Sequence, residues 1–268
     1  MSQKITLQDI FIYPIKSLGG IRLDSWIVEE KGFKYDRRWM LVDENGQFLS
    51  QRKHPSLVFL KVELGENSLQ VFDSKNSQNQ IEISLEEVGS DKLSVTVWDD
   101  EMEARSVSSE ADNWFSDYLG FPVRLVKMPE STKRKVDSKY AVNSESVSFA
   151  DGMPYLLISQ ASLDDLNSRL DEPISMNRFR PNLVFSGMTP FQEDQFVKMT
   201  VGEVEFQGIK LCARCVMITI NQETGEKGKE PLKTLATYRQ QGHKILFGQN
   251  VVALNSGKVK VGDTVTVH

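Results

Sequence analysis

Two cysteines three residues apart are the side chains in this sequence best suited to chemistry. Cys212 and Cys215 enclose an alanine and an arginine in the segment CARC, and the chain has 2 cysteines in total. The strand-like segment VMITI follows, whereas a thioredoxin-like redox pair sits at the start of a helix, whose dipole lowers the pKa of a thiol. A zinc site would need two further ligands, and the histidines are His54, His243 and His268.

Two other interpretations of the CARC segment remain open. Both cysteines could be small buried residues at the end of a strand. Alternatively, a single thiolate binds a soft metal centre, with Arg214 close enough to help keep the sulfur anionic. The residues alone leave all four interpretations open.

A second group of candidates is polar or cationic and lies at the ends of predicted strands. Lys16 and Ser17 follow one strand. Arg37 precedes a second strand, and Arg180 precedes a third. Loops converge at strand ends, so such side chains can clamp a phosphate, which a guanidinium does with two parallel hydrogen bonds. Taken singly, each cation is equally a surface charge or part of a structural ion pair, and it is their pattern that indicates an anion site.

Two asparagines offer neutral hydrogen-bonding groups in similar positions. Asn182 follows shortly after Arg180 in RFRPN, and Asn250 precedes the segment VVAL. Asparagine also serves in turns and caps, so the sequence alone does not decide between ligand contact and local structure.

Short strands separated by turns must position these side chains. Runs rich in Val, Ile, Phe and Thr recur, and Asn45-Gly46 is typical of a tight hairpin. Many short strands with close turns favour barrels, because closure removes exposed edges. The sequence therefore predicts a mainly β fold with a few helices. The predicted strands are DIFIYPI, RRWMLVD, LVFLKVEL, LSVTVW, VRLVKM, NLVFSG, VMITI and TVTV.

Three segments predict helices from their capping residues and apolar spacing. Ser109 with Asp112 resembles a capping box at the start of the first helix. Ser162 with Asp165 resembles the start of the second, and Pro231 can open the third.

Composition and charge restrict the class of protein. The 268 residues carry a formal net charge of -5, so nonspecific nucleic-acid binding is not expected, and any anion must be held by a local basic pocket. No signal peptide and no stretch long enough to cross a bilayer is evident. Two cysteines are too few for a disulfide-stapled secreted fold. We therefore expect a cytoplasmic protein without membrane contact.

At these residues the sequence resembles the MOSC family, named after the C-terminal domain of molybdenum-cofactor sulfurases, and is most similar within it to the amidoxime-reducing components and their bacterial relatives. The resemblance implies two β-barrel-like domains, an N-terminal barrel over residues 1–121 and a MOSC domain over 122–268, with a cofactor cleft between them. It runs in order through IYPIKS, DRRWMLVD, SQRKHPSLV, LLISQASLDDLNSRL, RFRPNLV, CARCVMITIN, TGEKGKEPLKTLATYR and KVKVGDTVTV.

The resemblance also implies roles for single residues. Cys215 matches the cysteine that ligates molybdenum, which makes it the catalytic residue and the metal ligand, whereas Cys212 matches a cysteine without an assigned ligand role. A tyrosine stands in the animal enzymes where this chain has Asn250, which makes that contact less secure. The residues matched to the molybdopterin cofactor are Lys16, Ser17, Arg37, Ser159, Arg180, Asn182 and Asn250.

The activity implied is a molybdenum-dependent reduction of small N-hydroxylated compounds, such as hydroxylaminopurines or amidoximes, in detoxification. Some long bacterial relatives carry a ferredoxin domain, which needs four cysteines. We therefore expect no iron–sulfur cluster in this chain, and electrons from a separate ferredoxin or flavoprotein. The alternative is a carrier or sulfur-transfer module for the cofactor. Pyridoxal phosphate is not supported, because no lysine has a recognisable Schiff-base context.

Overall fold

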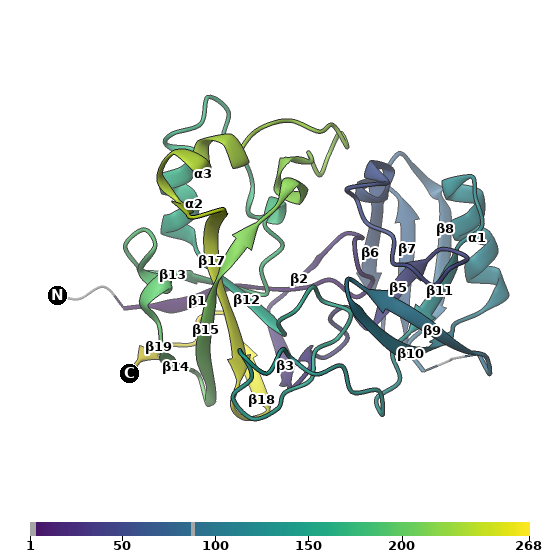
Figure 1. Cartoon of the computed structure of the whole chain (residues 1–268), viewed down its shortest axis with the longest axis horizontal. Coiled ribbons are helices and arrows are strands. Elements are labelled where there is room, and N and C mark those ends of the chain that lie inside the picture. The colour runs from purple at the N-terminus through teal and green to yellow at the C-terminus, as the bar shows by residue number, and fades with distance from the viewer. Residues whose placement is uncertain (1–3, 87–88) are drawn as a thin grey trace.

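The computed structural model describes residues 4–86 and 89–268, which form a mainly β fold with two lobes (Figure 1). Three α-helices lie among many short strands, as the sequence predicted. One lobe, on the left in Figure 1, combines the start of the chain with its second half. The other lobe, on the right, holds the strands β5 to β11 and the helix α1.

The first lobe is built around a nine-stranded sheet with the order β19-β14-β15-β17-β12-β13-β1-β2, in which β16 pairs with β17. All its ladders are antiparallel except β12 with β13. A bridge between Thr6 of β1 and Thr264, just before β19, brings the two sides of the sheet together, so the sheet curls towards a barrel. The strands are β1 (Thr6–Ile12), β2 (Ile21–Leu23), β12 (Tyr155–Ser159), β13 (Leu183–Ser186), β14 (Lys198–Val201), β15 (Val204–Arg214), β16 (Gln240–Gln241), β17 (Lys244–Ala253) and β19 (Val265–Val267).

A small sheet beside this barrel also joins distant parts of the chain. Its order is β18-β3-β4, with bounds Gly257–Lys260, Ser25–Glu29 and Gly32–Phe33. Together with β1, this sheet places the early strands β1, β3 and β4 in the lobe of the second half, and strand pairing therefore crosses the predicted domain boundary at residue 121. The apolar core of this lobe is accordingly shared, with Leu7 and Phe33 packed among residues of β12 to β17.

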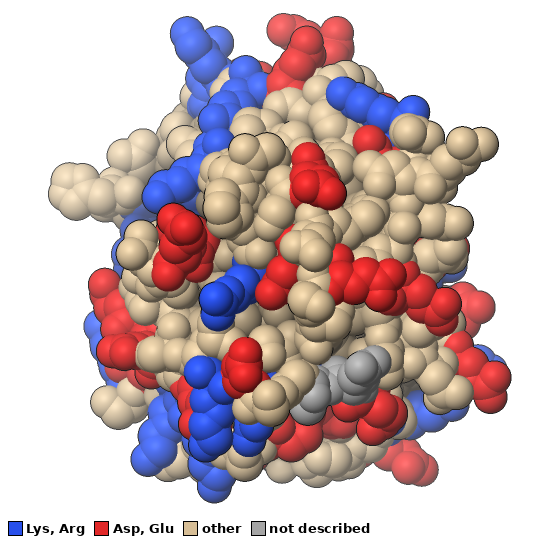
Figure 2. All heavy atoms as spheres, turned by 90° about the vertical axis from the view of Figure 1, so that its right-hand side faces the viewer, with Lys and Arg blue, Asp and Glu red and all other residues tan. Residues whose placement is uncertain are grey.

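The second lobe contains two sheets and one covering helix. One sheet has the order β5-β11-β10-β9 and the other β6-β7-β8. The helix α1 (Ser109–Leu119) packs on this lobe through Ala111 and Phe115. The outer face of the lobe carries acidic and basic side chains interspersed (Figure 2). The strands are β5 (Trp39–Val42), β6 (Leu60–Leu64), β7 (Ser68–Asp73), β8 (Asn76–Ser84), β9 (Lys92–Val97), β10 (Asp100–Ser106) and β11 (Arg124–Lys127).

The helices begin at residues that differ from the predicted caps. In α1 the cap is Ser108, whose hydroxyl accepts a hydrogen bond from the Ala111 amide, one residue before the predicted capping box. In α2 (Gln160–Asn167) the cap is Ser159, and the predicted cap Ser162 lies inside the first turn. The third helix, α3 (Leu232–Tyr238), follows Pro231 as predicted.

The segment VMITI is not a strand, contrary to prediction. It forms a short 3-10 helix, η4 (Val216–Thr219), directly after Cys215. The ladder between β15 and β17 ends at the pair Arg214 and Ile245, so the following residues lack a strand to pair with. Their amides bond to carbonyls three residues back instead. The other short helices are η1 (Pro55–Phe59), η2 (Met176–Arg178) and η3 (Gln192–Gln195).

Candidate functional site

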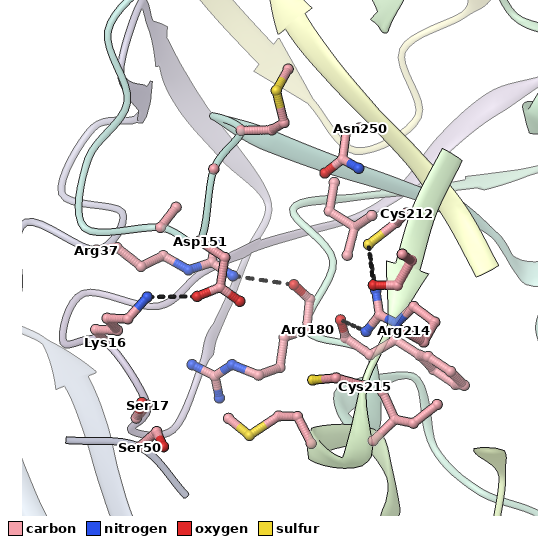
Figure 3. A pocket seen from close by; sticks show the side chains of 18 of the residues that line it. Lys16, Ser17, Arg37, Ser50, Asp151, Arg180, Cys212, Arg214, Cys215 and Asn250 are labelled. Atoms are coloured by element: carbon pink, nitrogen blue, oxygen red, sulfur yellow. Dashed lines mark hydrogen bonds and ion pairs between the residues drawn. The ribbon is translucent and has the colours of Figure 1, made fainter. Parts of the chain in front are cut away.

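A pocket between the two lobes collects almost all residues singled out in the sequence (Figure 3). It is lined from the first part of the chain by the loops after β1 and around β5, and from the second part by the loop before β13 and the end of β15. The predicted residues that line it are Lys16, Ser17, Arg37, Arg180, Asn182, Cys212, Cys215 and Asn250.

The two cysteines of the pocket have different surroundings. Cys215 directly follows the last residue of β15 and is exposed, whereas Cys212 lies within the strand and is partly buried. In Figure 3 the sulfur of Cys215 points to the side of the pocket where Arg180 and Lys16 lie. The guanidinium of Arg52, which comes from the other wall, donates to the Cys215 sulfur at 3.7 Å.

Arg214 serves the other cysteine, contrary to the role expected from the sequence. One of its nitrogens donates to the Cys212 sulfur at 3.1 Å, and another donates to the Phe179 carbonyl at 2.7 Å. These two bonds hold the side chain against the strand. The cation beside Cys215 is therefore Arg52, which the sequence analysis did not single out although it lies in the quoted motif SQRKHPSLV.

Arg37 is held in place by several acceptors. Its guanidinium donates to the Asp36 carboxylate at 2.6 Å, to the Asn182 side-chain oxygen at 3.1 Å and to the Arg180 carbonyl at 3.2 Å. Asp36 is fully buried, and its other oxygen accepts from the Tyr13 amide. Arg37 therefore has a structural task as well as a place in the pocket.

Arg180 is the cation that the chain compensates least. Its guanidinium lies 4.1 Å from the ring centroid of Tyr13, and Arg37 lies 4.2 Å from the same ring. Across residues 4–86 and 89–268, no acceptor or carboxylate pairs with the Arg180 guanidinium. Burial, helped by the positive charge of Arg37, lowers the pKa of Arg180 to about 10. It stays protonated at neutral pH, and an anion beside it would relieve the penalty.

Lys16 is buried next to an acidic side chain. Its ammonium donates to the Phe149 carbonyl at 2.7 Å and to the Asp151 carboxylate at 2.8 Å. Burial lowers the pKa of Lys16, and the charge of Asp151 opposes this shift. Arg134 donates to the Asp151 carbonyl at 2.9 Å and so fixes the loop that presents this carboxylate.

Three uncharged residues complete the predicted set in the pocket. The side-chain oxygen of Asn182 accepts from Arg37 and from the Leu156 amide, so this residue positions its neighbours. The hydroxyl of Ser17 donates to the Leu49 carbonyl at 3.0 Å. Asn250 donates to the Lys210 carbonyl at 3.4 Å across the ladder of β15 and β17.

Ser159 is the one predicted site residue that the structure does not bring to the pocket. Its side chain is fully buried and accepts from the Ser162 amide at 3.0 Å as the cap of α2. Its amide donates to the buried carboxylate of Glu193, which also accepts from the Ser162 hydroxyl. Its local task is to begin a helix.

Backbone strain is concentrated around the pocket. Ser17, Arg37 and Arg180 have φ values of 73°, 49° and 56°, in the left-handed region that side chains with a Cβ rarely adopt. Trp98, which donates to Asp151, has a φ of 59°. Such strain persists where the surrounding contacts over-determine it, and it clusters at functional sites.

The arrangement combines two kinds of chemistry in one pocket. An exposed thiol can become a thiolate that ligates a soft metal. Several fixed cations opposite it can hold an anion such as a phosphate. Arg178, Arg52 and Asp151 also line the pocket, and were not among the predicted site residues.

Two family models match the chain. The MOSC N-terminal beta barrel domain matches residues 4–122, and the MOSC domain matches residues 144–266. The second of these contains both cysteines, and the first contains Lys16, Arg37 and Arg52.

Curated relatives match along nearly the whole chain. The molybdenum cofactor sulfurase of Oryza sativa subsp. japonica is 35% identical over 98% of this chain, which spans 34% of the sulfurase. The mitochondrial amidoxime-reducing component 1 of Mus musculus is 31% identical over 99% of this chain and 83% of its own length. The mitochondrial amidoxime reducing component 2 of Rattus norvegicus is 32% identical over 99% of this chain and 84% of its own length. Within the part of the chain that the structure describes, no helix is long and apolar enough to span a bilayer.

Proposed function

Because the chain belongs to the family of MOSC-domain proteins, whose members here include amidoxime-reducing components and molybdenum cofactor sulfurases, we propose that it is a molybdenum-cofactor-dependent reductase of N-hydroxylated compounds. Its substrates would be small molecules such as hydroxylaminopurines or amidoximes. The observation that carries this proposal is the exposed thiol of Cys215 in one pocket with the uncompensated cation of Arg180.

The residues of the pocket fit a pterin cofactor with a metal and a phosphate. Cys215 would supply the single protein thiolate to molybdenum. Lys16, Arg37 and Arg180 would meet the negative charge of the phosphate, because charge-assisted hydrogen bonds to phosphate are among the strongest. Asn182 and Asn250 would hold neutral edges of the pterin. When bound, the cofactor supplies two-electron redox chemistry at the metal.

The proposed reaction is a reduction that consumes two electrons and two protons. The N–O bond of R–NHOH breaks, the nitrogen is left as R–NH₂, and the oxygen leaves as water. The chain's residues would orient the cofactor through Cys215 and through the cations that meet its phosphate. Ser159 is not part of this proposal, because its side chain is buried at the start of α2.

Electrons would come from a separate ferredoxin or flavoprotein, and the cytoplasmic location stays a prediction. The test mixes molybdenum-loaded protein with 6-hydroxylaminopurine and follows adenine formation. We expect turnover with reduced viologen as electron donor and none with NADPH alone. Turnover with NADPH alone would contradict dependence on a partner.

A second candidate function is favoured by the 35% identity to a molybdenum cofactor sulfurase. In this role Cys215 would carry a sulfur atom or help to hold the cofactor for another enzyme. Fully loaded protein that turns over no N-hydroxylated substrate with any donor would favour this role over the reductase.

A further inference from the structure

An exposed tryptophan lies beside the pocket and has no role in the proposed chemistry. Trp98 is 47% exposed and lies in the turn between β9 and β10. The guanidinium of Arg52 lies 4.4 Å from the centroid of its ring, and the ring of Phe48 lies at 5.2 Å. Both neighbours line the pocket, so the indole lies next to its wall.

The backbone at this tryptophan is one that favours glycine. Val97 pairs with Asp100, which leaves a two-residue turn made of Trp98 and Asp99. Trp98 occupies the first central position with a φ of 59°, where glycine is the usual residue. A large aromatic side chain is therefore kept in a conformation that costs free energy. Its contacts with Arg52 and Asp151 keep the indole on the pocket side of the turn.

A free hydrogen-bond acceptor lies next to the indole. One carboxylate oxygen of Asp151 accepts from Lys16 at 2.8 Å and from the Trp98 indole nitrogen at 3.2 Å. Across residues 4–86 and 89–268, its second oxygen accepts no hydrogen bond, and the side chain is 70% exposed. A flat apolar surface and an anionic acceptor thus lie side by side.

We propose that Trp98 and Asp151 form a recognition subsite for planar heteroaromatic N-hydroxylated substrates. The inference rests on the proposed reductase function and names the substrate class. The indole would stack on the ring of the substrate, and the free oxygen of Asp151 would accept an N–H from its edge. Aliphatic N-hydroxylated compounds have no ring to stack, so the subsite selects against them.

The test compares kcat/KM for 6-hydroxylaminopurine with kcat/KM for acetamidoxime, using reduced viologen. In Trp98→Gly the ratio of kcat/KM for 6-hydroxylaminopurine to kcat/KM for acetamidoxime should fall by about tenfold, the size expected for loss of one base–aromatic stack. Trp98→Phe should keep most of the ratio. Asp99→Ala, in the same turn, is the matched control and should leave it unchanged.

Two further measurements separate this inference from a structural role and from the function itself. Glycine suits the backbone at position 98, so Trp98→Gly should still fold in a cooperative thermal transition, although it loses the contacts with Arg52, Phe48 and Asp151. Calorimetry of adenine binding to loaded protein needs no turnover, and Trp98→Gly should weaken it by about tenfold. Weakened adenine binding without any turnover would overturn the function and keep the subsite. Turnover with an unchanged ratio and unchanged adenine affinity would overturn the subsite alone.

Discussion

The two walls of the pocket differ in how far their functional side chains are already engaged by other groups of the chain. The wall from the first part of the chain carries cations that are fixed before any ligand arrives, since Arg37 has three acceptors and Lys16 has two. The wall from the second part presents the thiol of Cys215, with one long contact to Arg52, and the guanidinium of Arg180, which has no acceptor among the described residues. The polar groups of the first wall are thus preorganised, whereas those of the second wall are left free to take a ligand. The difference indicates which changes should abolish binding and which should only weaken it.

Removal of the free sulfur should have the largest effect. Cys215→Ala should lose most of the bound molybdenum and all reductase activity, because under the proposed function this residue would supply the single protein thiolate to the metal. Cys212→Ala is the matched control, since its sulfur is already engaged by Arg214, and it should keep both. Metal analysis of protein purified from a host that makes the cofactor checks this. Equal loss of molybdenum from both variants would show that the two cysteines contribute equally and would support a paired-thiol site.

Removal of the uncompensated cation should weaken cofactor retention without removing it. A charge-assisted hydrogen bond is worth about 1.5–3 kcal/mol, so Arg180→Ala should lower cofactor affinity by about 10- to 100-fold. The rate of molybdenum loss during dialysis measures this effect. Arg22→Ala, which removes an exposed surface arginine, is the control. Full retention together with a lower thermal midpoint would make Arg180 a structural residue.

Arg37, on the wall from the first part of the chain, is a poorer test of phosphate binding than Arg180, for a physical reason. Its partner Asp36 is fully buried. Arg37→Ala would leave that carboxylate buried and unpaired, which costs about 3–5 kcal/mol of folding free energy. Loss of cofactor from this variant would therefore not separate binding from stability.

The smallest expected effect concerns the serine that lies outside the pocket. Ser159→Ala removes the side-chain cap of α2 and should lower the free energy of unfolding by about 1 kcal/mol. Molybdenum content should not change. Chemical denaturation and metal analysis of the same preparation check both statements. A loss of molybdenum with unchanged stability would restore the cofactor contact expected from the sequence.

Local patterns in the sequence identified most of the elements. Alternating apolar runs and turn residues predicted the mainly β fold, and Pro231 marked the start of α3. The error at VMITI has a physical cause, because β-rich composition says nothing of whether a partner strand continues alongside. The ladder stops at Arg214, and the chain turns into a 3-10 helix.

The contacts of the site were harder to predict than its members. Sequence proximity pointed to Arg214 as the cation for Cys215, whereas the structure supplies Arg52, 163 positions away, from the other wall. The position of Trp98 beside Arg52 and Asp151 was equally hidden in the sequence, which predicted it only as the last residue of the strand LSVTVW. These pairings depend on how the lobes pack, which no local pattern encodes.

The pairing of β1 with β13 has a consequence for how this protein folds during its synthesis. Ile10 pairs with Leu183, so this strand is synthesised 173 residues before its partner. At synthesis rates of about 5–20 residues per second, this strand waits for roughly 9 to 35 s before that ladder can form. During that interval its unpaired edge is open to association with other chains. We expect nascent chains stalled before residue 183 to require a chaperone that shields Thr6–Ile12.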